Sequence, residues 1–181
     1  MPTVFSHAAT GLGIATVIPV PGGLGRLVSA GALAAVFPDL DVVVHWLGVP
    51  WGHALDHRGI SHSLAFAAVL AALLSVTMFR GPGWSGRRGG LWLVLFLATA
   101  SHGVLDSMTN GGPGVALLAP FDGTRYFLPW RPIPVSPISP SRFFTQRGLD
   151  IVQTEILLIW IPTAALTIGG AALRGRRQGR A

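Results

Sequence analysis

ISHSLAFAAVLAALLSVTMF, residues 60–79, is the stretch that decides the fold of this chain. About 20 helical residues are enough to cross a hydrocarbon core of about 30 Å. The stretch is apolar and uncharged from Leu64 to Phe79, whereas its first four residues include two serines and a histidine. It therefore predicts a membrane-spanning helix that starts in a polar environment.

Further apolar segments extend this prediction along the chain. Residues 151–173 form a second span, and residues 90–106 form a slightly short third one. The segments 8–20 and 27–38 are separated by PGGLGR, and they are either two short helices or a re-entrant hairpin. We expect a single all-α membrane domain over residues 1–181, with about five transmembrane helices.

The composition supports a membrane protein and argues against nucleic acid as a partner. Half of the residues are hydrophobic and 11% are charged, with six Trp and nine Phe. The formal charge of +6 comes entirely from Arg, and these residues lie in short loops beside apolar runs, where they suit anionic lipid headgroups. The absence of Cys excludes disulfides and thiolate zinc sites, and no feature sets an oligomeric state.

The distribution of arginine predicts the orientation of the chain. With five crossings, one side collects eight Arg and no acid, and the other collects five Arg and all six Asp. By the positive-inside rule, the first side is cytoplasmic and includes the C-terminus. The eight Arg of that side are Arg26, Arg80, Arg87, Arg88, Arg174, Arg176, Arg177 and Arg180.

The segment 107–150 is rich in Pro, Gly and aromatic residues and has no helical period. It is too apolar for a disordered linker. We expect a lid or an interfacial loop that packs over a site.

Ionisable residues are scarce in this chain, and with five crossings they gather at one membrane face. His7, the PDLD of 38–41, the HRGISHS of 57–63, and the pair His102 and Asp106 all fall at outer ends of spans. Charge is costly in an apolar protein, so clustered charge indicates function. Imidazole and carboxylate are the ligands of divalent metals where no thiolate exists. The pattern predicts a metal site.

Two pairs within this set have a spacing that suits ligation. His102 and Asp106 are four residues apart and share a helix face, although a backbone bond and a helix-end role would also explain them. Asp39 and Asp41 follow Pro38, which is expected to break the helix, and two close carboxylates repel unless a cation lies between them. Helix capping would explain one of them, and Asp39 is the stronger ligand candidate.

The HRGISHS element contributes His57, His62 and Arg58. Gly59 allows a turn before a helix capped by Ser61 or Ser63, so both imidazoles can reach one centre. Arg58 would then be a fixed cation that holds a phosphate or carboxylate. His7 joins the set because of topology alone.

The remaining ionisable residues of the apolar segments receive other roles. His45, His53 and Asp56 lie in an interfacial stretch, and we expect them to be solvated or to support the ligands. Glu155 is a helix-start acid or a partner for an Arg.

These residues occur in the order of a known family pattern. The pattern is an N-terminal His, Pro-Asp-x-Asp, His-Arg-Gly-x-Thr/Ser-His-Ser, Ser-His-x-x-x-Asp with a following Thr, and Gly-Val-x-Leu-Leu-x-Pro. The chain thereby resembles the YdjM-like family of LexA-regulated, inner-membrane, predicted metal-dependent hydrolases. The counterparts are His7, Pro38 to Asp41, His57 to Ser63, Ser101 to Asp106 with Thr109, and Gly114 to Pro120.

The resemblance implies a hydrolase of the bacterial inner membrane that uses zinc or a similar ion, with kinship to zinc-dependent phospholipase C enzymes. We expect one or two ions, zinc or else manganese, and metal-activated water that cleaves a phosphoester or ester of a lipid-like substrate at the extracytoplasmic face. Asp41 would be a general base or bridging carboxylate, and Arg58 an anion clamp. A metal-ion or proton transporter is the alternative. The predicted metal ligands are His7, Asp39, His57, His62, His102 and Asp106.

Overall fold

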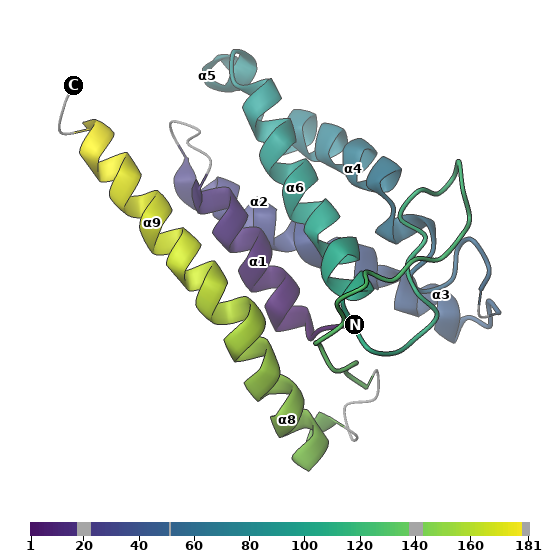
Figure 1. Ribbon diagram of the computed structural model, residues 1–181. Coiled ribbons are helices and arrows are strands. Elements are labelled where there is room, and N and C mark those ends of the chain that lie inside the picture. Colours follow the sequence, from purple (N-terminus) through teal and green to yellow (C-terminus); the bar gives the residue numbers. More distant parts are fainter. Residues whose placement is uncertain (18–22, 51, 138–142, 179–181) are drawn as a thin grey trace.

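The computed structural model describes residues 1–17, 23–50, 52–137 and 143–178, and these residues form helices and connecting loops without a named strand (Figure 1). The all-α prediction is therefore confirmed. Residues 18–20 of the first predicted segment lie outside the described residues. The helices are α1 (Val4–Val17), α2 (Leu24–Val36), α3 (Val42–Trp46), α4 (Leu64–Thr77), α5 (Pro82–Ser85), α6 (Arg88–Ser107), α8 (Gln146–Glu155) and α9 (Ile161–Gln178).

Three stretches of helix are long and apolar enough to cross a membrane: Leu24–Val44, Arg88–Ser107 and Gln146–Ala172. Two of them contain the predicted spans 90–106 and most of 151–173. The prediction of about five crossings is not confirmed, because α1 and α4 have only 14 residues each. At 1.5 Å per residue, a helix of that length measures about 21 Å, which is shorter than the hydrocarbon core. The orientation and the position of the site on the extracytoplasmic face, which assumed five crossings, stay predictions.

The helix does not break at Pro38. A 3₁₀ helix, η1 (Phe37–Asp41), continues α2 directly into α3, with Pro38 in its first turn. Proline lacks only an N–H that the first turn of a helix leaves unpaired, so the chain tightens instead of ending. The predicted break at this residue was wrong, and the correction separates Asp39 from Asp41. In a 3₁₀ helix, residues two apart point in different directions.

The α4 helix begins after a short 3₁₀ turn, η2 (Ile60–His62). Ser63 is its N-cap, as one of the two predicted alternatives, because its hydroxyl accepts a hydrogen bond from the Phe66 N–H at 3.0 Å. Residues 60–62 of the predicted span thus belong to the polar turn before the helix. Their side chains face the site described below and not the lipid.

Small residues bring the helices close together. A Cβ on Gly11 of α1 would lie 2.3 Å from the carbonyl oxygen of Gly31 of α2, so the two backbones meet where only glycine fits. Beneath the polar ends, α2, α4 and α6 share an apolar core. Its most buried members include Leu27, Ala30, Ala34, Ala71, Leu91, Val94 and Leu95.

The connection after α6 carries no helix before Gln146, where the last helix begins five residues earlier than predicted. Residues 108–137 fold back over the end of α6 (Figure 1). The Asn110 N–H donates to the Ile133 carbonyl at 2.9 Å, and the Leu128 N–H donates to the Ser107 carbonyl at 2.9 Å. Residues 138–142 of the predicted lid lie outside the described residues.

Candidate metal centre

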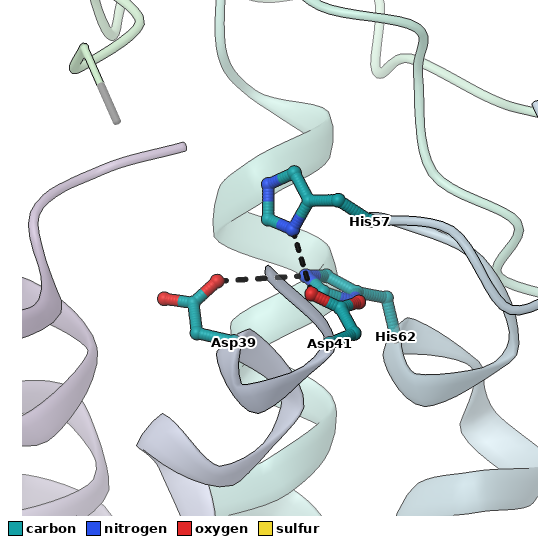
Figure 2. A group of neighbouring side chains, drawn as sticks. All are labelled: Asp39, Asp41, His57 and His62. Atoms are coloured by element: carbon teal, nitrogen blue, oxygen red, sulfur yellow. Dashed lines mark hydrogen bonds and ion pairs between the residues drawn. The ribbon is translucent and has the colours of Figure 1, made fainter. Parts of the chain in front are cut away.

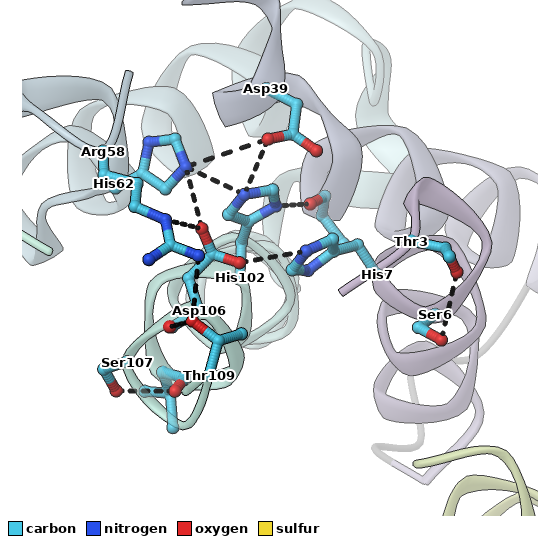
Figure 3. Close-up of polar contacts among 12 residues, drawn as sticks. Thr3, Ser6, His7, Asp39, Arg58, His62, His102, Asp106, Ser107 and Thr109 are labelled. Atoms are coloured by element: carbon cyan, nitrogen blue, oxygen red, sulfur yellow. Dashed lines mark hydrogen bonds and ion pairs between the residues drawn. The ribbon is translucent and has the colours of Figure 1, made fainter. Parts of the chain in front are cut away.

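Four helix ends meet at one end of the bundle, and each presents ionisable side chains (Figure 3). His7 lies in the first turn of α1, Asp39 in η1, His62 in η2, and His102 and Asp106 in the last two turns of α6. All five are mostly or fully buried. The structure thus brings together side chains from four separate parts of the chain, as predicted from topology.

The distances between the facing atoms match the edges of a coordination shell. The Nε2 atoms of His62 and His102 are 3.0 Å apart, and His102 Nε2 lies 3.3 Å from Asp39 Oδ1. Ligands about 2.0 to 2.2 Å from one ion are about 3.0 to 3.6 Å from one another.

Asp106 completes this shell on the other side. Its Oδ2 lies 3.6 Å from His62 Nε2, and its Oδ1 lies 3.5 Å from His7 Nε2. The ring of His7 stacks on that of His102, with centroids 3.7 Å apart. Five residues thereby surround one point.

Two of the imidazoles are held in the form that binds metal. His102 Nδ1 lies 2.7 Å from the Ala35 carbonyl of α2, which can only accept, so this nitrogen carries the proton and Nε2 of the neutral ring offers a lone pair. His62 Nδ1 likewise faces Asp41 Oδ2 at 3.1 Å. Burial lowers the pKa of His62 and so favours its neutral form. Two unprotonated nitrogens facing each other at 3.0 Å call for a cation between them.

Unpaired polar atoms point to the same conclusion. Both ring nitrogens of His7 and both oxygens of Asp39 are buried, yet they make no hydrogen bond within the part of the chain that the structure describes. A buried polar group without a partner costs about 1 to 3 kcal/mol. A divalent cation at this point would satisfy several of these atoms together, so the residues present fit a metal ion.

Asp41 occupies a different position from Asp39 (Figure 2). Its Oδ1 lies 2.8 Å from His57 Nδ1, and its Oδ2 faces His62 Nδ1 and also accepts a hydrogen bond from the Ser61 hydroxyl at 2.5 Å. The carboxylate therefore links the rear of one imidazole to another. A carboxylate behind a ligating histidine fixes the ring and raises its basicity. His57 belongs to a second group that could hold an ion, with Asp39, Asp41 and His62.

Arg58 is a buried cation fixed by three contacts. Its Nε lies 2.9 Å from Asp106 Oδ2, and its two terminal nitrogens donate to the Gly111 carbonyl at 2.9 Å and to the Thr109 hydroxyl at 3.0 Å. Its backbone has a φ of 67°, and Gly112 leaves space for the guanidinium, which a Cβ there would approach to 2.7 Å. The predicted fixed cation is present, and its partner is Asp106.

The residues expected to be solvated or supporting divide in two. His53 is exposed, whereas Asp56 is buried and its Oδ2 accepts a hydrogen bond from the Gly52 N–H at 2.9 Å. Of His45 only the backbone is described. None of the three belongs to the groups that could hold an ion.

Glu155 is the residue whose role sequence reasoning missed. It is fully buried and accepts hydrogen bonds from the Thr3 N–H at 2.6 Å, the Thr3 hydroxyl at 2.5 Å and the Ser6 hydroxyl at 2.6 Å. It thereby ties the last helix to the start of α1, one residue before His7. The available signal was a lone acid inside an apolar span, which marks a paired or functional group.

The fold and the site together define a class: an all-helical membrane protein with a buried His/Asp cluster that can hold a metal ion at one end of the bundle. Within that class, the chain belongs to the YdjM inner membrane protein family, whose sequence profile matches residues 1–176. It is 40% identical over 169 residues to inner membrane protein YbcI of Escherichia coli (strain K12), covering 90% of this chain and 92% of that protein. No solved structure matches the chain. The resemblance inferred from the motifs is therefore confirmed.

Proposed function

We propose that this protein is a membrane-bound, metal-dependent hydrolase that cleaves a phosphoester or ester bond in a lipid-like substrate. The observation that carries the proposal is the convergence of five ligand atoms around one point, from three histidines and two aspartates on four elements. Histidine and carboxylate ligands suit zinc, and manganese is the alternative.

The chain's residues would hold the ion and orient the reactants. A divalent ion bound here would supply Lewis acidity and a water molecule activated at neutral pH. His7, Asp39, His62, His102 and Asp106 are the proposed ligands. His57, with Asp39, Asp41 and His62, could complete a second ion site beside the first, within the same cluster.

Asp41 and Arg58 act beside these ligands. The three contacts that Asp41 makes to His57, His62 and Ser61 favour an orienting role, in which it fixes the imidazoles, over that of a free base. Arg58 holds Asp106 and also lines a small cavity with His57, where its charge would attract a phosphate or carboxylate.

The transporter alternative lacks a comparable observation. Among the described residues, the core beneath the cluster is built of Leu, Ala, Val and Phe. Ion or proton transport requires polar groups along the path through the membrane. The polar side chains gather at one end, which suits a catalytic site at a surface.

The test is metal analysis of the purified protein together with a substrate panel. We expect one or two zinc or manganese ions per chain, lost in His62→Ala and Asp106→Ala and retained in the control His53→Ala, whose side chain is exposed. Chelator-sensitive cleavage of a phospholipid or phosphoester supports the hydrolase. Metal-free wild-type protein would overturn it, and ion flux across liposomes without product would favour the transporter.

A further inference from the structure

Two cavities of opposite character adjoin the metal centre. The smaller measures about 80 Å³ and is lined by Arg58 and His57 together with residues of the loop after α6. The larger is an open groove of about 530 Å³ between the start of α1, the η1 and α3 segment and the chain near Phe144. Ser136 lines both.

The larger groove is apolar along its length and polar at one end. Its walls include Phe5, Leu40, Val43, Trp46 and Phe144, all exposed apolar side chains. Its polar end is Asp39, whose Oδ1 lies 3.3 Å from His102 Nε2. A molecule that fills the groove therefore ends against the proposed ligands.

We propose that this groove binds the acyl chain of the substrate, while the Arg58 cavity receives its anionic head, so that the substrate is an anionic amphiphile and not a soluble phosphoester. This inference rests on the proposed function, because it places the bond to be cleaved at the metal centre.

The geometry of the chain favours this occupant over a protein partner. A hydrocarbon tail needs an apolar channel and no hydrogen bonds, and the groove offers apolar walls. An anionic head needs a fixed cation, and Arg58 is held in place by Asp106, Thr109 and Gly111. The two compartments meet at the ligands, so the polarity along the site is that of a lipid with its head at the metal.

Two phosphonates provide the test, because their P–C bond resists hydrolysis. We would titrate zinc-loaded, full-length protein in nanodiscs with octylphosphonate and with methylphosphonate. Val43→Trp fills the groove, Val43→Phe is a milder version, and Val69→Trp is the matched control, since Val69 on α4 is 69% exposed and Val43 is 49% exposed. Metal content is measured in every variant.

We expect Val43→Trp to weaken octylphosphonate binding about tenfold, equivalent to roughly two buried methylene groups, with methylphosphonate affinity and metal content unchanged. Val43→Phe should show a smaller loss, and Val69→Trp none. Equal losses in Val43→Trp and Val69→Trp, or octylphosphonate binding insensitive to both Val43 variants, would overturn the groove assignment and leave the metal site standing. Metal-free wild-type protein would instead overturn the proposed function and this inference with it.

Discussion

Asp106 is the residue on which the centre converges. Its two oxygens face His7 and His62, and Arg58 lies behind it. A carboxylate in this position is stabilised by the guanidinium before any ion arrives. Removing the guanidinium leaves a buried, unpaired charge, whereas an ion can replace only part of its contacts.

Arg58→Ala should therefore destabilise the metal-free protein strongly. We expect the free energy of unfolding to fall by about 3 to 5 kcal/mol, the usual cost of removing one partner of a buried ion pair. Denaturant titration in detergent micelles measures this loss. The control is Arg80→Ala, whose side chain is exposed at the end of α4, and equal effects of the two variants would contradict the role of the pair.

Asp41→Asn should weaken metal binding without abolishing it. Its carboxylate orients His57 and His62, and loss of such an orienting group lowers metal affinity about 10- to 100-fold. Chelator competition measures the dissociation constant. Asp122→Asn is the control, because Asp122 is an exposed loop residue that contacts only Thr124 and Tyr126 among the partners seen. Complete loss of metal in Asp41→Asn would make this residue a ligand.

At this scale, local spacing predicted some of the site and missed the rest. The His102 and Asp106 pair follows from the helix repeat, because residues four apart share a face. The ion pair between Arg58 and Asp106 could not be predicted, since a long guanidinium reaches any of several acids once the chain folds. The division of roles between Asp39 and Asp41 depended on the 3₁₀ geometry after Pro38.

At the scale of elements, close backbone contacts fix how the ligands meet. Gly103 lies on α6 beside His102, and a Cβ there would lie 2.5 Å from the His62 carbonyl oxygen. Only a residue without a side chain allows η2 to approach α6 this closely. The distance between two ligands is therefore set by a glycine that carries no chemistry itself.

Gly103→Ala should push η2 away and damage the site. We expect a loss of about 1 to 3 kcal/mol in stability, typical of overpacking, together with weaker metal binding. Gly89→Ala is a control on the same helix, since a Cβ there meets no atom within 4 Å. Thermal unfolding and metal titration measure both effects, and a harmless Gly103→Ala would show that η2 has room to adjust.

Glu155 connects the last helix to the ligand on α1. We expect Glu155→Ala to weaken metal binding about tenfold, because Thr3 and Ser6 lose the acceptor that sets the position of His7. In a His7→Ala background the same change should have no further effect on metal affinity. A double-mutant cycle measures this coupling, with exposed Gln153→Ala as the control. Additive losses would mean that Glu155 does not act through His7.

Helix lengths explain why the element count differed from the sequence prediction. Hydropathy located the apolar segments 90–106 and 151–173 well, because composition alone identifies long spans. It extended α4 too far, since ISHS reads as the start of an apolar run although it forms the polar turn of the site. It also placed a break at Pro38, where the chain passes from α-helix to 3₁₀ helix without interruption.

For the whole molecule, the site lies at one end of α6 and α5 lies at the other (Figure 1). The sequence prediction puts the site on the extracytoplasmic face. Because the chain has no cysteine, single introduced cysteines report sidedness directly. Thr124→Cys, beside the site, should react with a membrane-impermeant maleimide in intact cells, and Ser85→Cys, in α5, should react only after lysis. The reverse pattern would invert the orientation.

The ligands of the centre are spread from His7 to Asp106, and Glu155 fastens the first of them from near the other end of the chain. A partly synthesised or partly inserted polypeptide therefore owns only fragments of the cage. Ion uptake thereby reports completed assembly, and tight uptake would act as a seal on the finished protein, since a ligand that binds only the native state stabilises it.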